Sequence, residues 1–355
     1  KICACMGNRF DIETLALVTA KPMEKILSAM DILMQEGFII RVGDLYRFHH
    51  DRIQEAAYSL LAPEERVRSH YQIGILVLNR STPEQVSKRI FYIADQLNHG
   101  RGLITDASER NHLAQLDLRA GIKAKDSTAY GAAVTYLQAG IDLLPERPWQ
   151  TLYDLTYALH MEQMMCQYLA RNPDEAERLF QVILVNAASK TDQAKAYNAM
   201  VILYTNMRTA KDAAILGIKG LNLLGIRVSI DIGEMAVLRE LIEVKFRLRK
   251  IPLESILDLP GMQDEDKINC MDLLINTGTP AYFINPNLYA VLVLKGVILC
   301  LKHGNHPGAA VAFIALGTII QTVFGDYALG YRIGEMALKL NDRLGNKNLA
   351  GMVYH

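Results

Sequence analysis

Beyond residue 61 the sequence consists almost entirely of helical patterns, and strand patterns are confined to its N-terminal part. Helix starts are marked by capping sequences. Thr82-Pro83-Glu84-Gln85 is a capping box with proline at the first helical position, and Asn172-Pro173-Asp174-Glu175 repeats the arrangement. Ser189 to Asp192 is a weaker copy, and only the connection near residues 226–230 has an extended character. The chain is therefore predicted to be mainly α.

The first 37 residues predict two short helices. Asp11 is placed to cap a helix that runs through Ala20, and Pro22 opens a second helix that ends at Gly37. Apolar residues of the second helix recur at the spacing of one helical face: Met23, Ile26, Leu27, Met30, Leu33 and Met34. This helix carries Lys21 and Lys25 but also Glu24, Asp31 and Glu36, a charge balance that does not favour insertion into a DNA groove.

Two short runs rich in β-branched and aromatic residues follow, residues 38–42 and 45–48. Gly43-Asp44 between them is a hairpin turn signal. A helical pattern then extends to Leu61. The order helix, helix, hairpin, helix predicts a winged-helix domain over residues 1–61, followed by connecting helices over residues 62–125.

A degenerate repeat indicates a solenoid of helical hairpins, similar to tetratricopeptide repeats, over residues 126–355. Small and apolar residues share one register in four copies, of which the first three start 43 and 38 residues apart: Ala133, Leu137, Gly140 and Ile141; Ala176, Phe180, Ile183 and Leu184; Ala214, Ile218 and Leu221; Gly330, Gly334, Ala337 and Leu338. Residues 226–284 break the pattern, because Pro252, Pro260, Gly261 and Pro280 mark turns. An irregular stretch is expected there.

Composition limits the classes of function. Lys and Arg number 38 and so do Asp and Glu, so the chain has no net charge and no dedicated nucleic-acid surface is predicted. The five cysteines are scattered and odd in number, which favours a reducing, cytoplasmic location. No signal peptide is apparent. Two apolar runs, residues 288–301 and 309–324, are too short to span a bilayer and are expected to be buried helices.

No catalytic or metal site follows from spacing. The Walker A pattern is missing, and His49-His50-Asp51 lacks the downstream asparagine of a kinase catalytic loop. Cys3 and Cys5 have no second ligand pair nearby. Cys300, His303 and His306 lie three residues apart, but histidines at a helix end also interact favourably with the helix dipole.

The segment from Phe48 to Tyr58, FHHDRIQEAAY, resembles the FxHDRxQxAAY segment of the ATPase module in large bacterial and fungal hybrid sensor kinases. Those proteins carry a serine/threonine-kinase-like domain, a STAND-type AAA ATPase, helical repeats, a GAF domain and a histidine kinase. Further blocks resemble the family in the same order along the chain: residues 4–11, 70–74, 91–98, 116–125 and 325–331.

The resemblance implies a nucleotide-sensing role for three residues. In STAND ATPases a winged-helix histidine approaches the phosphates of bound ADP, and His50 matches that position, with Asp51 and Arg52 expected to orient it or to bridge to the nucleotide domain. ATP or ADP and Mg²⁺ are expected in an ATPase domain outside this chain, which resembles a fragment of a longer polypeptide. Alternatively, His50 and Asp51 simply cap the following helix.

Together these patterns predict a regulatory and interaction region of a multi-domain signal-transduction ATPase–kinase, with no catalytic residue, cofactor or metal of its own. Its expected partners are the ATPase core and kinase domains of the parent chain, and its input is a protein, a peptide or a small molecule. No nucleic-acid binding and no membrane insertion are expected. Alternatively, the helical repeats form a small-molecule sensor, with Tyr153, Tyr157, Tyr197 and Tyr204 as pocket candidates unless they are core residues.

Overall fold

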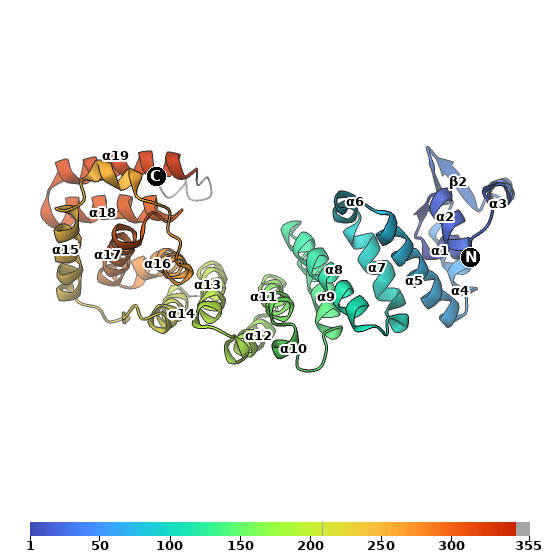
Figure 1. Cartoon of the computed structure of the whole chain (residues 1–355), viewed down its shortest axis with the longest axis horizontal. Helices are drawn as coiled ribbons and strands as arrows, with labels where there is room; N and C mark the ends of the chain where they lie inside the picture. Colours follow the sequence, from blue (N-terminus) through green and yellow to red (C-terminus); the bar gives the residue numbers. More distant parts are fainter. Residues whose placement is uncertain (208, 346–355) are drawn as a thin grey trace. The chain divides into compact units, whose positions relative to one another are not determined.

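A computed structural model describes residues 1–207 and 209–345 (Figure 1). The chain is mainly α-helical, as predicted, and the described residues contain one three-stranded sheet near the N-terminus. The residues form two compact units, Lys1–Ala176 and a second unit that begins at Glu177. Each unit has a hydrophobic core of its own.

The first unit starts with a small mixed module and continues with helices. The module comprises α1 (Ile2–Cys5), β1 (Arg9–Phe10), α2 (Ile12–Thr19), α3 (Met23–Gln35), β2 (Ile39–Val42), β3 (Leu45–Phe48) and α4 (Asp51–Ser59). The helices that follow are α5 (Pro63–Arg80), α6 (Pro83–Lys88), α7 (Ile90–Gly100), α8 (Ala107–Asp126), α9 (Tyr130–Asp142), α10 (Pro148–Thr151) and α11 (Tyr153–Leu169), with a 3-10 turn at Arg101–Leu103.

Local sequence signals account for most of the module. The Asp11 carboxylate caps α2 by accepting a hydrogen bond from the Thr14 amide at 2.6 Å. Gly37, at φ +74°, ends α3, and Gly43, at φ +63°, forms the hairpin turn between β2 and β3. The helices and the hairpin predicted for residues 11–48 are therefore present. The sequence patterns did not reveal α1 or β1, and β1 pairs antiparallel with β3 to give the strand order β1-β3-β2.

The core of the first unit begins under the sheet and extends into the helices. Phe10 packs against Tyr46 and Phe48, with ring centroids 6.2 and 5.6 Å apart. The same cluster of buried side chains includes Ile73 of α5 and Ile93 of α7. The predicted domain limits at residues 61 and 125 stay predictions.

The second unit is helical throughout its described residues, apart from its connections. Its helices are α13 (Lys190–Met207), α14 (Ala210–Leu223), α15 (Glu234–Leu248), α16 (Glu265–Ile284), α17 (Pro286–His303), α18 (Ala309–Phe324) and α19 (Tyr327–Leu344), and α12 (Pro173–Asn186) spans the boundary between the units. A 3-10 turn occupies Leu253–Asp258.

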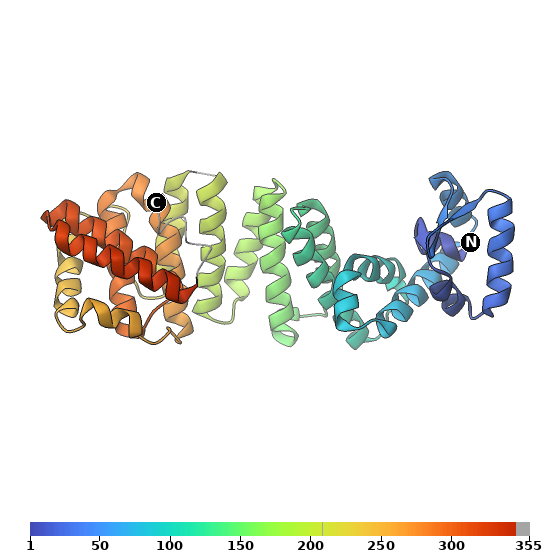
Figure 2. The same ribbon diagram turned by 90° about the horizontal axis from the view of Figure 1, so that it is seen from above.

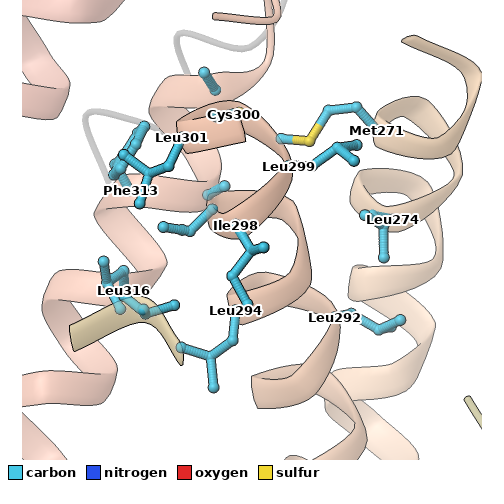
Figure 3. Packing of buried hydrophobic residues seen from close by; sticks show 14 of the residues in the cluster. Met271, Leu274, Leu292, Leu294, Ile298, Leu299, Cys300, Leu301, Phe313 and Leu316 are labelled. Atoms are coloured by element: carbon cyan, nitrogen blue, oxygen red, sulfur yellow. The ribbon is translucent and has the colours of Figure 1, made fainter. Parts of the chain in front are cut away.

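Helix α17 is the centre of the second core. Figure 3 shows Leu292, Leu294 and Leu299 of this helix among side chains of α16 and α18 such as Met271, Phe313 and Leu316, all of which are almost completely buried. By length and composition alone α17 would suffice to cross a membrane, yet 67% of its apolar stretch is buried within the structure. Packing against α15, α16 and α18 explains why α17 is apolar on nearly all sides.

The stretch 226–284 is more regular than expected, because it contains α15 and α16. The expectation that Pro280 marks a turn is wrong: this residue lies inside α16. An internal proline costs a helix about 3 kcal/mol, and α16 offsets this by burying Leu273, Leu274 and Ala281 against its neighbours. Irregular connections remain on both sides of α15.

The small residues of the repeat register lie where helices approach closely. Gly140, Gly330 and the alanines at 133, 176, 214 and 337 are buried. A Cβ atom on Gly330 would lie 2.8 Å from the Gly317 carbonyl oxygen, so only glycine allows α18 and α19 to run side by side at this distance (Figures 1 and 2).

Candidate functional site

The predicted nucleotide-sensing residues lie together at the junction between β3 and α4. His50 is the N-cap residue of α4, with extended backbone, and its side chain is exposed and makes no capping hydrogen bond. Its ring lies edge-on to that of His49, with centroids 4.6 Å apart. His50 is therefore the N-cap residue of α4 by backbone position, but its side chain does not cap the helix.

Asp51 and Arg52 form the first turn of α4, and both are exposed. The Asp51 carboxylate accepts a hydrogen bond of 2.8 Å from the side-chain amide of Asn8, which ties the start of α4 to the segment before β1. In the described structure the Asp51 carboxylate is thus hydrogen-bonded to Asn8 and not to the His50 ring. Since no side chain caps α4, the amides of Asp51 and Arg52 are available to bind an anion, together with the partial positive charge of the helix dipole. The Ile53 amide already donates to the His50 carbonyl oxygen at 3.0 Å.

A chain of buried hydrogen bonds fastens the far end of α4 to the helices behind it. The Tyr58 hydroxyl donates to His70 Nε2 at 3.0 Å, and His70 Nδ1 donates to the Gln96 side-chain oxygen at 2.8 Å. The Gln96 amide nitrogen in turn donates to the Cys5 carbonyl oxygen at 2.8 Å. Burial lowers the pKa of His70, so the ring accepts from Tyr58 in its neutral form. This network joins α4, α5, α7 and α1.

A buried carboxyl group lies further along the same unit. Asp117 on α8 is completely buried and accepts a hydrogen bond of 2.7 Å from the side-chain amide of Asn98 on α7. Burial raises the pKa of Asp117 to about 8. The carboxyl is therefore mostly protonated at neutral pH. Sequence patterns missed both His70 and Asp117, although each is a polar residue at a position where the helical pattern calls for an apolar one.

The cysteines and histidines that were weaker candidates for metal ligands are buried in the core, lie apart or are bonded to other groups. Cys300 is completely buried in the core, and burial raises the pKa of its thiol to about 12. His306 is buried and accepts a hydrogen bond of 3.0 Å from the Gly308 amide, with its other nitrogen 3.3 Å from Asp272, whereas His303 is exposed. Burial also raises the pKa of the Cys3 and Cys5 thiols. Across residues 1–207 and 209–345, no group of three metal-ligating side chains was found.

The second unit contains a cavity that the sequence did not indicate. It measures about 700 Å³ and is formed by α16, α17 and α18, with Val237 of α15 at its edge. The tyrosines proposed from sequence lie elsewhere. Tyr153 and Tyr157 stack on each other with centroids 5.8 Å apart, Tyr197 packs edge-on against Phe180, and Tyr204 is buried. These tyrosines pack against other side chains and do not line this cavity.

Comparison with known proteins links the chain to one class of signalling protein. Hybrid signal transduction histidine kinase G of Dictyostelium discoideum is 23% identical to the chain over 437 aligned residues. The alignment covers 99% of this chain but 13% of that kinase, so the chain spans a small part of its relative. No protein-family model and no solved structure matches the chain. The similarity supports a signalling role and a relation to multi-domain sensor histidine kinases.

Proposed function

We propose that the chain is the regulatory and interaction region of a cytoplasmic multi-domain signal-transduction ATPase–kinase and that it catalyses no reaction itself. Residues 1–61 are assigned as a winged helix, supported by the order of α2, α3, the β2–β3 hairpin and α4. Residues 126–355 are assigned as a solenoid similar to tetratricopeptide repeats, supported by buried small residues at the repeat positions. The similarity to a hybrid histidine kinase supports the class of parent protein.

The winged helix is proposed to sense the nucleotide held by an ATPase domain of the parent chain. The observation that carries this role is the uncapped start of α4, where the His50 and Arg52 side chains are both exposed beside the amides of Asp51 and Arg52. A diphosphate would accept hydrogen bonds from these amides and from the two side chains. Asp51 holds the turn in place through Asn8. No cofactor is needed within this chain.

The state of α4 is proposed to pass to the helical region through Tyr58 and His70. Their hydrogen bond joins α4 to α5, and Gln96 extends the connection to α7. A displacement of α4 by the ATPase core therefore strains a buried network and shifts the balance between two arrangements of the module. The helical repeats would receive a protein, peptide or small-molecule input and pass it to the kinase domains, without binding nucleic acid or inserting into a membrane.

The test measures association between this chain and the ATPase segment of its parent protein by calorimetry, with and without ADP. ADP is expected to tighten the complex. His50→Ala should remove that gain, roughly 10- to 100-fold in Kd, because a hydrogen bond to a charged group contributes about 1.5–3 kcal/mol. His49→Ala is the matched control, since His49 is the exposed neighbour outside the motif, and it should keep the gain. Unchanged ADP dependence in His50→Ala would refute the sensing role.

A second candidate function, small-molecule sensing by the helical repeats, is favoured by the cavity between α16, α17 and α18. Its volume of about 700 Å³ lies within the range of ligand pockets, roughly 300–1,000 Å³. A ligand bound there would provide an input to the same regulatory region. A thermal-shift screen of the full chain tests this function: a saturable rise in melting temperature with one compound supports it, and no shift with any compound contradicts it.

A further inference from the structure

The walls of the α16–α18 cavity carry no charged side chain. Two charged residues of the same helices have partners that do not line the cavity: Lys295 lies 3.0 Å from Glu240, and Asp272 lies 3.3 Å from His306. An ion entering the cavity would lose its hydration without gaining a partner, which costs far more than the burial of apolar surface returns. The cavity therefore favours an uncharged ligand.

Small residues create the space. Gly278, Ala290, Gly296, Ala312 and Ala315 all contribute to the walls. A Cβ atom on Gly296 would lie 3.4 Å from the Met271 Cε and 3.6 Å from the Ala312 Cβ. The floor at Gly296 is thus close-packed against both neighbouring helices, and larger side chains along these faces would fill the volume.

The two ends of the cavity differ in polarity. Gly296 of α17 lies opposite Ala312 of α18, and Asn287 lies about nine residues away along α17, roughly 14 Å. Asn287 and Tyr289 thus form a polar end of the cavity at the start of α17. The other end is apolar: Met271, Leu292 and Ala312 are at most 5% exposed.

Polar groups at this end of the cavity can form further hydrogen bonds. Within the described part of the chain, the Asn287 carboxamide and the Tyr289 hydroxyl make no hydrogen bond, so both groups can donate and accept. Tyr282 packs edge-on against both Phe283 and Tyr289 at the rim. A neutral hydroxyl or ester group would find both donors and acceptors here.

The cavity has the size of a small-molecule site. Its volume of about 700 Å³ lies within the range of ligand pockets, roughly 300–1,000 Å³. It is therefore large enough for one drug-sized molecule.

We propose that this cavity binds an uncharged amphipathic small molecule, with a hydrocarbon body against Met271, Leu292 and Ala312 and a neutral hydroxyl or ester head near Asn287 and Tyr289. This assignment rests on small-molecule sensing, the second candidate function, and names the chemical class of its ligand. It is independent of nucleotide sensing at His50.

Two pairs of probes test the class on the full chain. N-phenylnaphthylamine and anilinonaphthalenesulfonate share one ring system, but only the second is charged. The neutral probe should bind saturably with increased fluorescence and the sulfonate should not. Dodecanol should displace the neutral probe, whereas dodecanoate, with the same tail and a charged head, should not. All titrations stay below the concentrations at which these compounds form micelles.

Variants locate the binding. Ala315→Phe on α18 and Ala290→Phe on α17 place a ring in the cavity and should each weaken binding of the neutral probe by roughly tenfold or more. Ala328→Phe, the same substitution at an exposed position of α19 outside the cavity, should leave the affinity unchanged. Circular dichroism confirms that each variant folds, and the two cavity variants serve as alternatives if one does not.

Three other outcomes would each contradict the proposal in a different way. If charged and neutral probes bind equally and both are lost in Ala315→Phe, the ligand class is wrong while small-molecule sensing stands. If probes bind the cavity-filling variants as tightly as the natural chain, the cavity is not the site. If neither probe binds and sedimentation shows a dimer that Ala315→Phe disrupts, the surface is an interface between copies, and small-molecule sensing fails with the proposal.

Discussion

The helices α5, α7 and α8 of the first unit meet through buried polar groups, whereas α16, α17 and α18 of the second meet through aliphatic and aromatic ones. His70, Gln96 and Asp117 are buried in the first interface. Phe313 and Leu316 are buried in the second, where the Cys300 thiol stays neutral because its pKa is raised to about 12. The stability of the first interface therefore depends on pH near neutrality, whereas Phe313 and Leu316 stabilise the second by apolar packing.

The largest effect is expected in the second unit. Phe313→Ala should lower its free energy of unfolding by about 3–5 kcal/mol, since it removes a fully buried ring and leaves a void. The change should be the same at pH 5 and pH 8. Urea unfolding followed by circular dichroism measures it, and a loss below about 1 kcal/mol would mean that Phe313 is not a core residue.

Asp117→Asn tests the polar interface. The pKa of this carboxyl is raised from 3.8 to about 8. The folded state therefore keeps a proton that the unfolded state releases, and stability is lost as pH rises from about 4 to about 8. The amide keeps a hydrogen-bonding group without the charge, so the variant should be about 2–4 kcal/mol more stable than the natural chain at pH 8 and similar below pH 4.

The single tryptophan provides the readout for this unit. Trp149 lies within the first unit, with its ring 4.9 Å from that of His160, so its fluorescence reports unfolding of that unit. Urea midpoints of Asp117→Asn and of the natural chain are compared at pH 5 and pH 8. If the difference in midpoint between Asp117→Asn and the natural chain does not grow from pH 5 to pH 8, Asp117 is not the buried acid.

Tyr58→Phe breaks the link between α4 and α5. It should destabilise the first unit by about 1 kcal/mol, because His70 Nε2 loses its donor while the ring stays in place. In the natural chain, the lowered pKa of His70 means that stability is lost as pH falls below about 6.5. Trp149 fluorescence at pH 7.5 measures the change, and a variant as stable as the natural chain would show that the hydrogen bond contributes nothing.

The smallest effect concerns the exposed site. Asn8→Ala removes the contact with Asp51 and should change the free energy of unfolding by at most about 0.5 kcal/mol, because both groups are solvated. It should still weaken ADP-dependent association with the ATPase segment by about twofold to fivefold, since the first turn of α4 loses its anchor. Equal association in the variant and the natural chain would leave Asn8 without a role.

Sequence signals predicted an element well where residues only a few positions apart determine it. The caps at Asp11 and Thr82 and the turn at Gly43 depend on residues a few positions away, and all three were found. Pro280 misled the prediction, because burial of the surrounding residues of α16 outweighs a local preference.

The features that the sequence did not reveal depend on residues that lie far apart in the chain. Gln96 donates to the Cys5 carbonyl 91 residues away, and His70 meets Gln96 across 26 residues. A single sequence gives no spacing rule for such pairs. The sequence did not reveal the cavity either. The residues that leave it open, such as Gly296 and Ala315, are of the same small types that elsewhere bring helices into contact. For His50, the sequence indicated the residue but not the uncapped helix end beside it.

Hydrogen exchange tests the central claim most directly, in a polypeptide that joins this chain to the ATPase segment of its parent. Adding ADP should slow exchange of the amides at the start of α4, residues 51–54, and leave α16, α17 and α18 unchanged. If ADP binds the ATPase segment while residues 51–54 exchange at the same rate with and without it, the start of α4 does not sense nucleotide.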